Sequence, residues 1–311
     1  MTDQVHTIAE VALDTGIQKD TLRVWERRYG FPVPVRGAGE ERAYDDAQLT
    51  RLRLIKRLLD SGMRAGQVVA QPLEALNSLV LAACQPSAAH AVSATVEPLL
   101  MLLLQHQRKN LHDSLMVHVE TTGLGQAIES IISPMAARVG ELWMRGELAL
   151  YEEHLFTSVV QGVLLQGMAQ LPLQGAGESP KVVLTTLNHE PHALGLLMAE
   201  CMFAQMGCDR ISLGPKTPAV DLAQAARVMQ ADIVALSFSS HTSPKAALLG
   251  VTHLRDLLPS HIAIWAGGSA STLSQVKRAN VARVFGVAQE LLDAVTQWRL
   301  GAVQPQDRVK R

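Results

Sequence analysis

The residues of this chain that could do chemistry fall at three places in its C-terminal third. The first is a turn after an apolar run, where the chain reads Glu-Pro-His-Ala-Leu-Gly from Glu190 to Gly195. Small residues follow at the ends of two later apolar runs, at Ser237 and Ser239 and at Gly267 and Gly268. A neutral imidazole on a loop can bind one metal atom, and small residues leave open space beside it. A flat, bulky cofactor with a single metal coordination position requires this combination.

These places resemble the corrinoid-binding signature of cobalamin-binding domains. Between Gly195 and Ser237 lie 41 residues, and between Ser239 and Gly267 lie 27, spacings typical of that family. Glu190 stands where aspartate is commoner, and Ser239 stands where leucine is usual.

The resemblance implies a role for each motif residue. His192 would give an imidazole nitrogen to cobalt as the lower axial ligand and displace the cofactor's own benzimidazole base, which would run as a tail into a slot beside a sheet. Glu190 would accept the second imidazole N–H and hold the ring's tautomer. Gly195 would let a helix approach, while Ser237 and the pair Gly267-Gly268 would leave room for the tail.

Other site chemistries fit the residues less well. His189 and His241 are alternative cobalt ligands, but neither occupies the motif position. His189 and His192 could share a zinc ion, yet no third and fourth ligand appears at a usable spacing. No Gly-x-Gly-x-x-Gly follows the first expected strand, and no Ser/His/Asp or Cys/His constellation indicates hydrolysis. We therefore predict that the chain is not an enzyme.

Length and composition set wider limits. A chain of 311 residues with 48% apolar and 18% charged content predicts two or three globular domains. The net charge of -1 gives no overall basic field, so contact with nucleic acid must come from local arginines. Cys84, Cys201 and Cys208 show no paired spacing, which favours reduced thiols in a cytoplasmic protein. Residues 1–7 lack the order of a signal peptide, and the apolar run at 99–104 is too short for a membrane span.

The N-terminal segment predicts two short helices. Thr7 and Glu10 form a capping box that begins the first helix, and Gly16 ends it. A second helix over residues 19–29 places Arg23 and Arg27 four apart on one face. Two helices joined by a tight turn are typical of a helix-turn-helix, whose second helix enters the major groove of DNA.

The following stretch strengthens this interpretation. Residues 36–44 contain glycines that permit a hairpin tip and arginines that could flank a DNA backbone. Asp45 then caps a leucine-rich helix that stops at Gly62. This order resembles the MerR family of winged-helix DNA-binding domains. We expect DNA contacts from Arg23, Arg27, Arg28, Arg42 and Tyr44.

Residues 1–72 are nearly neutral, with 11 Lys and Arg against 10 Asp and Glu. One copy should bind double-stranded DNA weakly, because phosphate neutralisation supplies most non-specific affinity. We therefore expect a homo-oligomer, a dimer or tetramer, on repeated operator half-sites.

The middle segment predicts a four-helix bundle, because four stretches show helical apolar periodicity without strand alternation. They cover residues 76–83, 89–107, 113–132 and 155–171. Taken alone, Trp143 there is a core residue, and Glu153 with His154 is a surface pair.

The corrinoid motif downstream changes the interpretation of these three residues. Trp143, with Glu153 ten residues later and His154 next, matches the capping motif of the CarH/LitR light-responsive MerR regulators. By this resemblance Trp143 would cover the upper axial group, and Glu153 and His154 would shape the pocket around a 5'-deoxyadenosyl moiety. In that family the residue after the tryptophan is a histidine that binds cobalt after illumination. Here it is Met144, a softer ligand, so a bis-histidine photoproduct is not expected.

The C-terminal segment predicts a doubly wound parallel α/β sheet, because short apolar runs alternate with helical stretches after a Gly- and Pro-containing break. The expected strands cover residues 181–186, 210–213, 233–237, 262–266 and 282–285. We place a winged-helix domain at 1–74, a helical cap at 75–173, a Rossmann-like cobalamin-binding domain at 180–303 and a tail at 304–311.

The resemblances together imply a transcriptional repressor controlled by adenosylcobalamin and by light. Two alternatives stay open. One is a cobalamin-level sensor or light-independent regulator, which Met144 favours. The other is a corrinoid carrier for a methyltransferase or mutase, which would have no use for an N-terminal winged helix.

Overall fold

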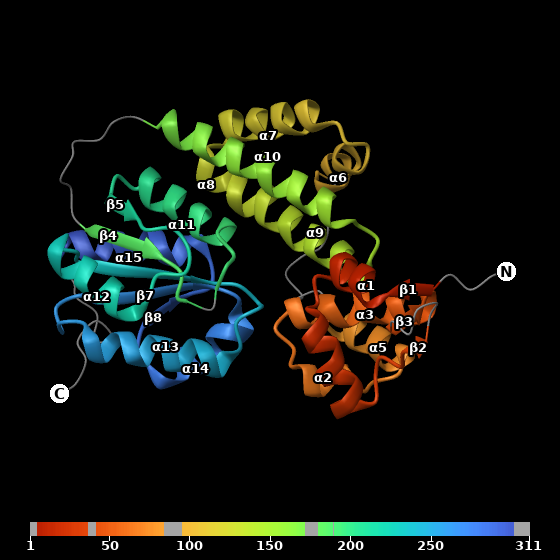
Figure 1. Ribbon diagram of the computed structural model, residues 1–311. Coiled ribbons are helices and arrows are strands. Elements are labelled where there is room, and N and C mark those ends of the chain that lie inside the picture. The colour runs from red at the N-terminus through yellow and green to blue at the C-terminus, as the bar shows by residue number, and fades with distance from the viewer. Residues whose placement is uncertain (1–4, 37–41, 84–94, 172–179, 189, 302–311) are drawn as a thin grey trace. The chain divides into compact units, whose positions relative to one another are not determined.

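The computed structural model describes residues 5–36, 42–83, 95–171, 180–188 and 190–301, and the predicted tail at 304–311 lies outside them. The chain divides into two compact units (Figure 1). One unit comprises Met1–Ser87 with Met144–Glu147, and the other comprises Ala88–Trp143 with Leu148–Arg311.

The first unit begins with the predicted helix-turn-helix. Helix α1 (Ile8–Thr15) starts at the Thr7 capping box and ends at Gly16, whose φ of 69° lies in the left-handed region. Helix α2 (Lys19–Tyr29) follows and turns Leu22 and Trp25 into the core. The Thr7 capping box and Gly16 therefore mark both ends of α1, as the sequence predicted.

A small antiparallel sheet completes the winged part of this unit. Strand β3 (Arg42–Asp45) lies between β1 (Val5–Thr7) and β2 (Val35–Arg36). The wing strands were expected from sequence, but β1 was not, because three residues carry no alternation signal. The expected hairpin tip at 37–41 lies outside the described residues.

Two later helices belong with this unit. The Asp45 carboxylate caps α3 (Asp46–Asp60), which buries a leucine-rich face. After the short α4 (Ala65–Val68), helix α5 (Leu73–Ala83) packs against α3. The stretch 76–83, expected as the first bundle helix, therefore packs with the DNA-binding fold. The bounds of the three domains stay a prediction.

The bundle of the second unit is built differently from the sequence expectation. Its helices are α6 (Val96–Leu104), α7 (Arg108–Thr122), a continuous α8–η1–α9 and α10 (Leu150–Ala169). The expected helix 113–132 is broken at Gly123, whose φ is 86°. The helix that carries Trp143 was missed.

Proline explains why that helix was missed. Segments α8 (Leu124–Ala127), η1 (Ile128–Ile132) and α9 (Ser133–Arg145) run on from one another, with a π-turn in which the Ser133 N–H donates to the Ile128 carbonyl. Pro134 follows at once. A wider turn relieves the crowding that a proline ring causes in an α-helix, so the helix continues through a residue that normally ends one.

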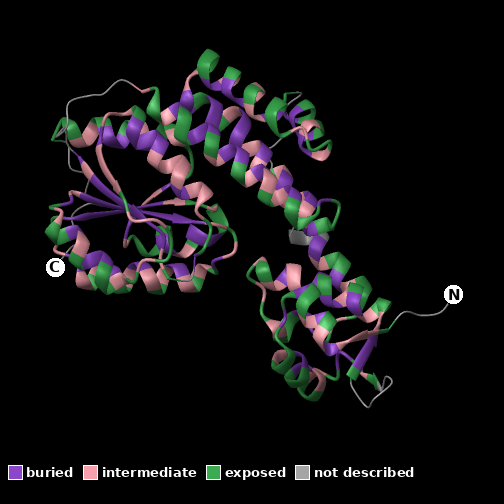
Figure 2. Ribbon diagram, turned by 45° about the horizontal axis from the view of Figure 1, so that its top comes forward, coloured by how far each residue is buried: buried purple, intermediate pink, exposed green. Residues whose placement is uncertain are grey.

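The rest of the second unit is a five-stranded parallel sheet in the order β5-β4-β6-β7-β8. The central strands β4, β6 and β7 are buried along most of their length, whereas the edge strands β5 and β8 are mostly half-buried (Figure 2). They are β4 (Lys181–Thr185), β5 (Asp209–Ser212), β6 (Ile233–Phe238), β7 (Ala263–Gly268) and β8 (Arg283–Phe285).

Helices cover both faces of this sheet. One face packs against α11 (Leu194–Gln205) and α15 (Ala288–Arg299), and their core is continuous with that of the bundle. The other face packs against α12 (Ala219–Val228), α13 (Pro244–Leu257) and α14 (Ala270–Ala279). The predicted classes of winged helix, helical bundle and doubly wound sheet are all confirmed. Within the described ranges, no helix is long and apolar enough to cross a membrane.

Two cysteines test this packing. Burial raises the pKa of the Cys201 thiol to about 12 and that of Cys208 to about 11, so both stay protonated at neutral pH. We expect no alkylation of either by iodoacetamide in the native protein and complete alkylation in guanidinium, measured by peptide mass spectrometry. Native labelling of Cys201 at the rate of a free thiol would contradict this packing. Cys84 lies outside the described residues and is assayed on its own peptide.

Candidate functional site

The three sequence motifs come together at the carboxyl edge of the parallel sheet. The strand order reverses between β4 and β6, and ligands of such sheets bind at this switch point. His192 lies on the loop after β4, and Ser239 directly follows β6. Ser237 pairs with Gly267 in the parallel register of β6 and β7.

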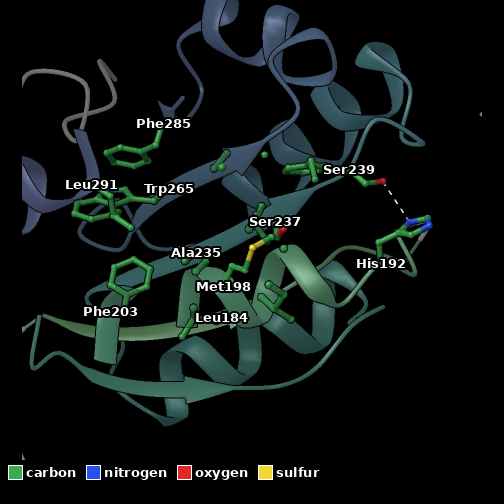
Figure 3. Close-up of a pocket in the computed structure, with 18 residues that line it drawn as sticks. Leu184, His192, Met198, Phe203, Ala235, Ser237, Ser239, Trp265, Phe285 and Leu291 are labelled. Carbon is green, nitrogen blue, oxygen red and sulfur yellow. Dashed lines mark hydrogen bonds between the residues drawn. The ribbon is translucent and has the colours of Figure 1, made fainter. Parts of the chain in front are cut away.

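An apolar slot opens beside these residues, between α11 and the sheet. Its empty volume is about 780 Å³, part of it open to solvent. His192 and Ser239 lie at one end, and Phe203, Trp265 and Phe285 lie at the other (Figure 3). The slot therefore suits a long ligand with a polar end and a flat apolar end.

The His192 side chain is held from one side. Its Nδ1 lies 2.6 Å from Oε1 of Glu190, which is buried, while the imidazole itself is 44% exposed. An ionised carboxylate can only accept, so Nδ1 carries a proton, and in the neutral ring Nε2 then keeps its lone pair. The side chain is therefore set up as an Nε2 metal ligand with a carboxylate behind it.

Glu190 is charged although it is buried. Burial raises its pKa, but hydrogen bonds from His192 and Ser239 outweigh that effect and hold the pKa at about 2. Oε2 accepts from the Ser239 N–H at 2.7 Å, from the Ser239 hydroxyl at 2.8 Å and from the Thr242 hydroxyl at 2.9 Å. The carboxylate thus fastens the His192 loop to the loop after β6.

Thr242 and His241 are the site residues that sequence reasoning underrated. Thr242 was not considered, although a buried carboxylate needs several donors and the sequence Ser239-Ser240-His241-Thr242 offers hydroxyls nearby. His241 was weighed only as a ligand, yet its ring stacks on that of His192. His189 lies outside the described residues. In the described part of the chain, no cluster of three or more His, Cys, Asp or Glu could hold a metal ion.

The glycines of the motifs serve different purposes. A Cβ on Gly195 would lie 2.9 Å from the Ser237 hydroxyl, so glycine lets α11 approach β6. A Cβ on Gly267 would meet nothing within 4 Å, which leaves open space beside the sheet. Gly268 differs from the prediction. With φ of 124°, its added Cβ would overlap the Phe238 carbonyl, so the backbone itself requires glycine there.

The predicted cap residues lie on the bundle. Trp143 is on α9 and packs partly buried against the shared core. Glu153 and His154 lie in the first turns of α10, where Glu153 accepts from the Thr157 hydroxyl at 2.8 Å. His154 is 68% exposed. The slot beside His192 is lined by α11 and the sheet, and these three residues are not part of its lining.

The predicted DNA-binding residues divide into two groups. Arg23, Arg27 and Arg28 are exposed on α2. Tyr44 has no exposed surface, and its hydroxyl donates to Glu26 on α2. Burial raises the pKa of the tyrosine most, and the hydrogen bond to Glu26 raises it further. The structure therefore gives Tyr44 a place in the core and leaves it no surface for DNA.

Arg42 bonds to the same carboxylate as Tyr44. Its Nε lies 3.0 Å from Glu26 Oε2, and half of the arginine side chain stays exposed. Glu26 therefore ties the second helix of the helix-turn-helix to the wing strand β3. Arg42 is partly exposed, but its guanidinium is already paired with Glu26.

Comparison with known proteins shows which families the two units resemble. Residues 6–69 match the family described as MerR HTH family regulatory protein, and residues 95–166 and 180–296 each match a B12 binding domain. The HTH-type transcriptional repressor CarH of Myxococcus xanthus is 30% identical over 279 residues, covering 88% of this chain and 91% of that protein. The chain belongs to the CarH family of MerR-type regulators.

Two further likenesses agree with this family. The HTH-type transcriptional repressor CarA of Myxococcus xanthus is 28% identical over 252 residues, 79% of each chain. The Methanosarcina barkeri monomethylamine corrinoid protein shares 15% identity and a TM-score of 0.50 over 63% of this chain and 94% of its own, a likeness of fold alone. Family membership makes this chain a DNA-binding transcriptional regulator with B12-binding domains, and not an enzyme.

The residues of the site fit a corrinoid. His192 offers an Nε2 donor of the kind cobalt binds, and Glu190 supplies the carboxylate behind it. The open space beside Gly267 and the aromatic end of the slot suit a flat base. Donor and slot are both present without any rearrangement of the described residues.

Gly267 and Gly268 are neighbours that need glycine for different reasons: Gly268 for its backbone conformation and Gly267 for the space it leaves for a ligand. We expect Gly268→Ala to lower the free energy of unfolding by roughly 2 kcal/mol or more, because its backbone is strained and its Cβ overlaps Phe238. Gly267→Ala should change stability by less than about 0.5 kcal/mol and yet weaken cobalamin binding. Urea unfolding and a binding titration measure the two effects. Equal stability losses at both positions would contradict this distinction.

Tyr44 and Arg27 separate core from surface in the first unit. Tyr44→Phe removes a donor from Glu26 and should cost roughly 1–3 kcal/mol of stability, with an unchanged salt dependence of DNA binding. Arg27→Ala should leave stability unchanged and reduce the slope of log K against log salt by about 1. Thermal melts and salt-dependent binding isotherms measure both. A loss of DNA affinity in folded Tyr44→Phe would show that the tyrosine hydroxyl contacts DNA.

Proposed function

We propose that the chain is a transcriptional repressor whose grip on its operator is controlled by adenosylcobalamin and by light. The observation that carries the proposal is the His192 imidazole, with Nδ1 bonded to the buried Glu190 and Nε2 available, at the mouth of an apolar slot. Membership of a family of repressors with B12-binding domains supports it.

The cobalamin would be held by residues of the parallel sheet and its loops. His192 would supply the protein ligand to cobalt, and Glu190 would hold the proton on Nδ1 so that Nε2 stays a donor. The slot between α11 and the sheet excludes water from the nucleotide base. Ser237, Ser239 and Gly267 border the space that the base enters.

The bundle residues would act on the other side. We assign Trp143 the covering of the upper axial group, and Glu153 and His154 the shaping of the space around a 5'-deoxyadenosyl moiety. When bound, adenosylcobalamin supplies a cobalt–carbon bond that visible light breaks. A ligand held by both the sheet and the bundle favours one arrangement of the protein, and losing the adenosyl group withdraws that preference.

The DNA-binding side would require several copies. Residues 1–72 hold 11 basic and 10 acidic residues, so a single winged helix binds phosphate weakly. A dimer or tetramer places several α2 helices on repeated half-sites and multiplies the affinity. We assign the DNA contacts to Arg23, Arg27, Arg28 and Arg42, with Tyr44 holding the wing strand from the core.

Met144 supports a second candidate function. In this chain the residue after Trp143 carries a thioether, which is a softer ligand than imidazole. A regulator that senses cobalamin level without responding to light is consistent with that side chain. The two candidates differ only in what illumination does.

A gel-shift titration on the chain's operator tests the proposal. We expect adenosylcobalamin in the dark to tighten DNA binding about 5- to 150-fold, the range of ordinary allosteric coupling, and green light to remove the gain. Analytical ultracentrifugation of the same samples should show an oligomer only in the dark holo state.

His192→Ala provides the matched control for that titration. It should bind DNA like the apoprotein in both conditions, because it removes the cobalt ligand and leaves the winged helix intact. DNA binding that is unchanged by cofactor and light in the wild-type chain would refute the repressor switch. Tightening that survives illumination would select the cobalamin-level sensor.

A further inference from the structure

We propose that His241 is a positioning residue that fixes the ring plane of His192 and so aims its Nε2 lone pair at cobalt. The inference rests on the proposed role of His192 as the cobalt ligand. No motif of the B12-binding signature includes position 241, and the role comes from the geometry of this chain.

The two imidazoles are stacked. Their ring centroids lie 4.1 Å apart, and their planes differ by 18°. His192 comes from the loop after β4 and His241 from the loop after β6, so the stack joins the two sides of the switch point. Stacked aromatic pairs contribute attraction beyond the area that they bury.

The hydrogen bonds at Nδ1 are insufficient to aim a ligand on this loop. The Glu190 carboxylate at 2.6 Å and the Ser239 hydroxyl at 3.3 Å both hold Nδ1 (Figure 3), but the ring can still turn about that one atom, and 44% of the side chain is exposed. The Nε2 lone pair lies in the ring plane, so its direction follows the plane. A flat neighbour on one face removes this remaining freedom.

The Ser239 hydroxyl oxygen lies within hydrogen-bonding distance of both rings, 3.3 Å from His192 Nδ1 and 3.2 Å from His241 Nδ1. The hydroxyl donates to Glu190 Oε2 at 2.8 Å, and therefore it accepts from His241 Nδ1. The Ser239 oxygen also accepts from the His241 backbone N–H at 3.1 Å. The His241 ring is thus linked through Ser239 to the Glu190 carboxylate that also orients His192. These hydrogen bonds keep the two imidazole rings next to each other.

The stack also favours the coordinated form of His192 electronically. An imidazole that donates to cobalt loses electron density and becomes partly positive. The π-face of a neighbouring ring attracts positive charge, more strongly where water is partly excluded. His241 therefore stabilises His192 on cobalt relative to His192 off cobalt, besides restricting its motion.

Electron paramagnetic resonance with cob(II)alamin tests the role directly. Protein labelled with ¹⁵N-histidine converts the nitrogen triplet on cobalt to a doublet only when the axial nitrogen comes from the protein. We expect a doublet for the wild-type chain. His241→Ala should reduce the doublet fraction and weaken cob(II)alamin binding about 2- to 12-fold, the range of an aromatic stack.

Three further variants give the result its meaning. His241→Phe keeps a flat ring and should restore most of the doublet and the affinity. His261 is an exposed histidine just before the N-terminal end of β7, away from the carboxyl edge of the sheet where His192 lies. His261→Ala should therefore behave as wild type. His192→Ala should abolish the doublet.

The outcomes separate the two proposals. Wild-type doublet and affinity in His241→Ala, or equal losses in His241→Ala and His241→Phe, would overturn the positioning role while His192 remains the ligand. A doublet that survives His192→Ala, or is absent from the wild-type chain, would overturn the assignment of His192 itself.

Discussion

The buried carboxylate of Glu190 is the constraint on which the B12-binding half of this protein depends. A charge without water must be satisfied by hydrogen bonds, and within the described residues five donors from three residues supply them. The donors come from the loops after β4 and β6, which are adjacent strands of the sheet. Satisfying one charge therefore fixes the distance between the two loops, the tautomer of His192 and the mouth of the slot together.

A carboxylate plays a comparable part in the DNA-binding unit. Glu26 on α2 accepts from Tyr44 and Arg42 on β3, so the recognition helix and the wing strand share one acidic partner. Tyr44 reaches it from the core and Arg42 from the surface. In both units a largely buried glutamate joins two elements that are distant in sequence, and the exposed residues beside it are left for the ligand or the DNA.

Helix α11 connects the slot to the bundle. One side of the helix lines the slot through Gly195 and Phe203, while the Gln205 side chain accepts from the Gly125 N–H of α8 at 2.8 Å. Bundle and sheet share a single hydrophobic core across this helix. A group that fills the slot therefore contacts the same helix that the bundle packs against.

The sequence by itself determined what short-range chemistry controls. The Thr7 capping box, the cap at Asp45 and the spacing of His192, Ser237 and Gly267 each act within a few residues or at fixed strand ends, so the fold classes and the corrinoid motifs followed from them. Helix α9 did not follow, because Pro134 signals a break that a π-turn relieves. Only the tertiary structure placed Tyr44 in the core and stacked His241 on His192. Burial and cross-loop contact depend on which strands lie side by side, and no local pattern records that.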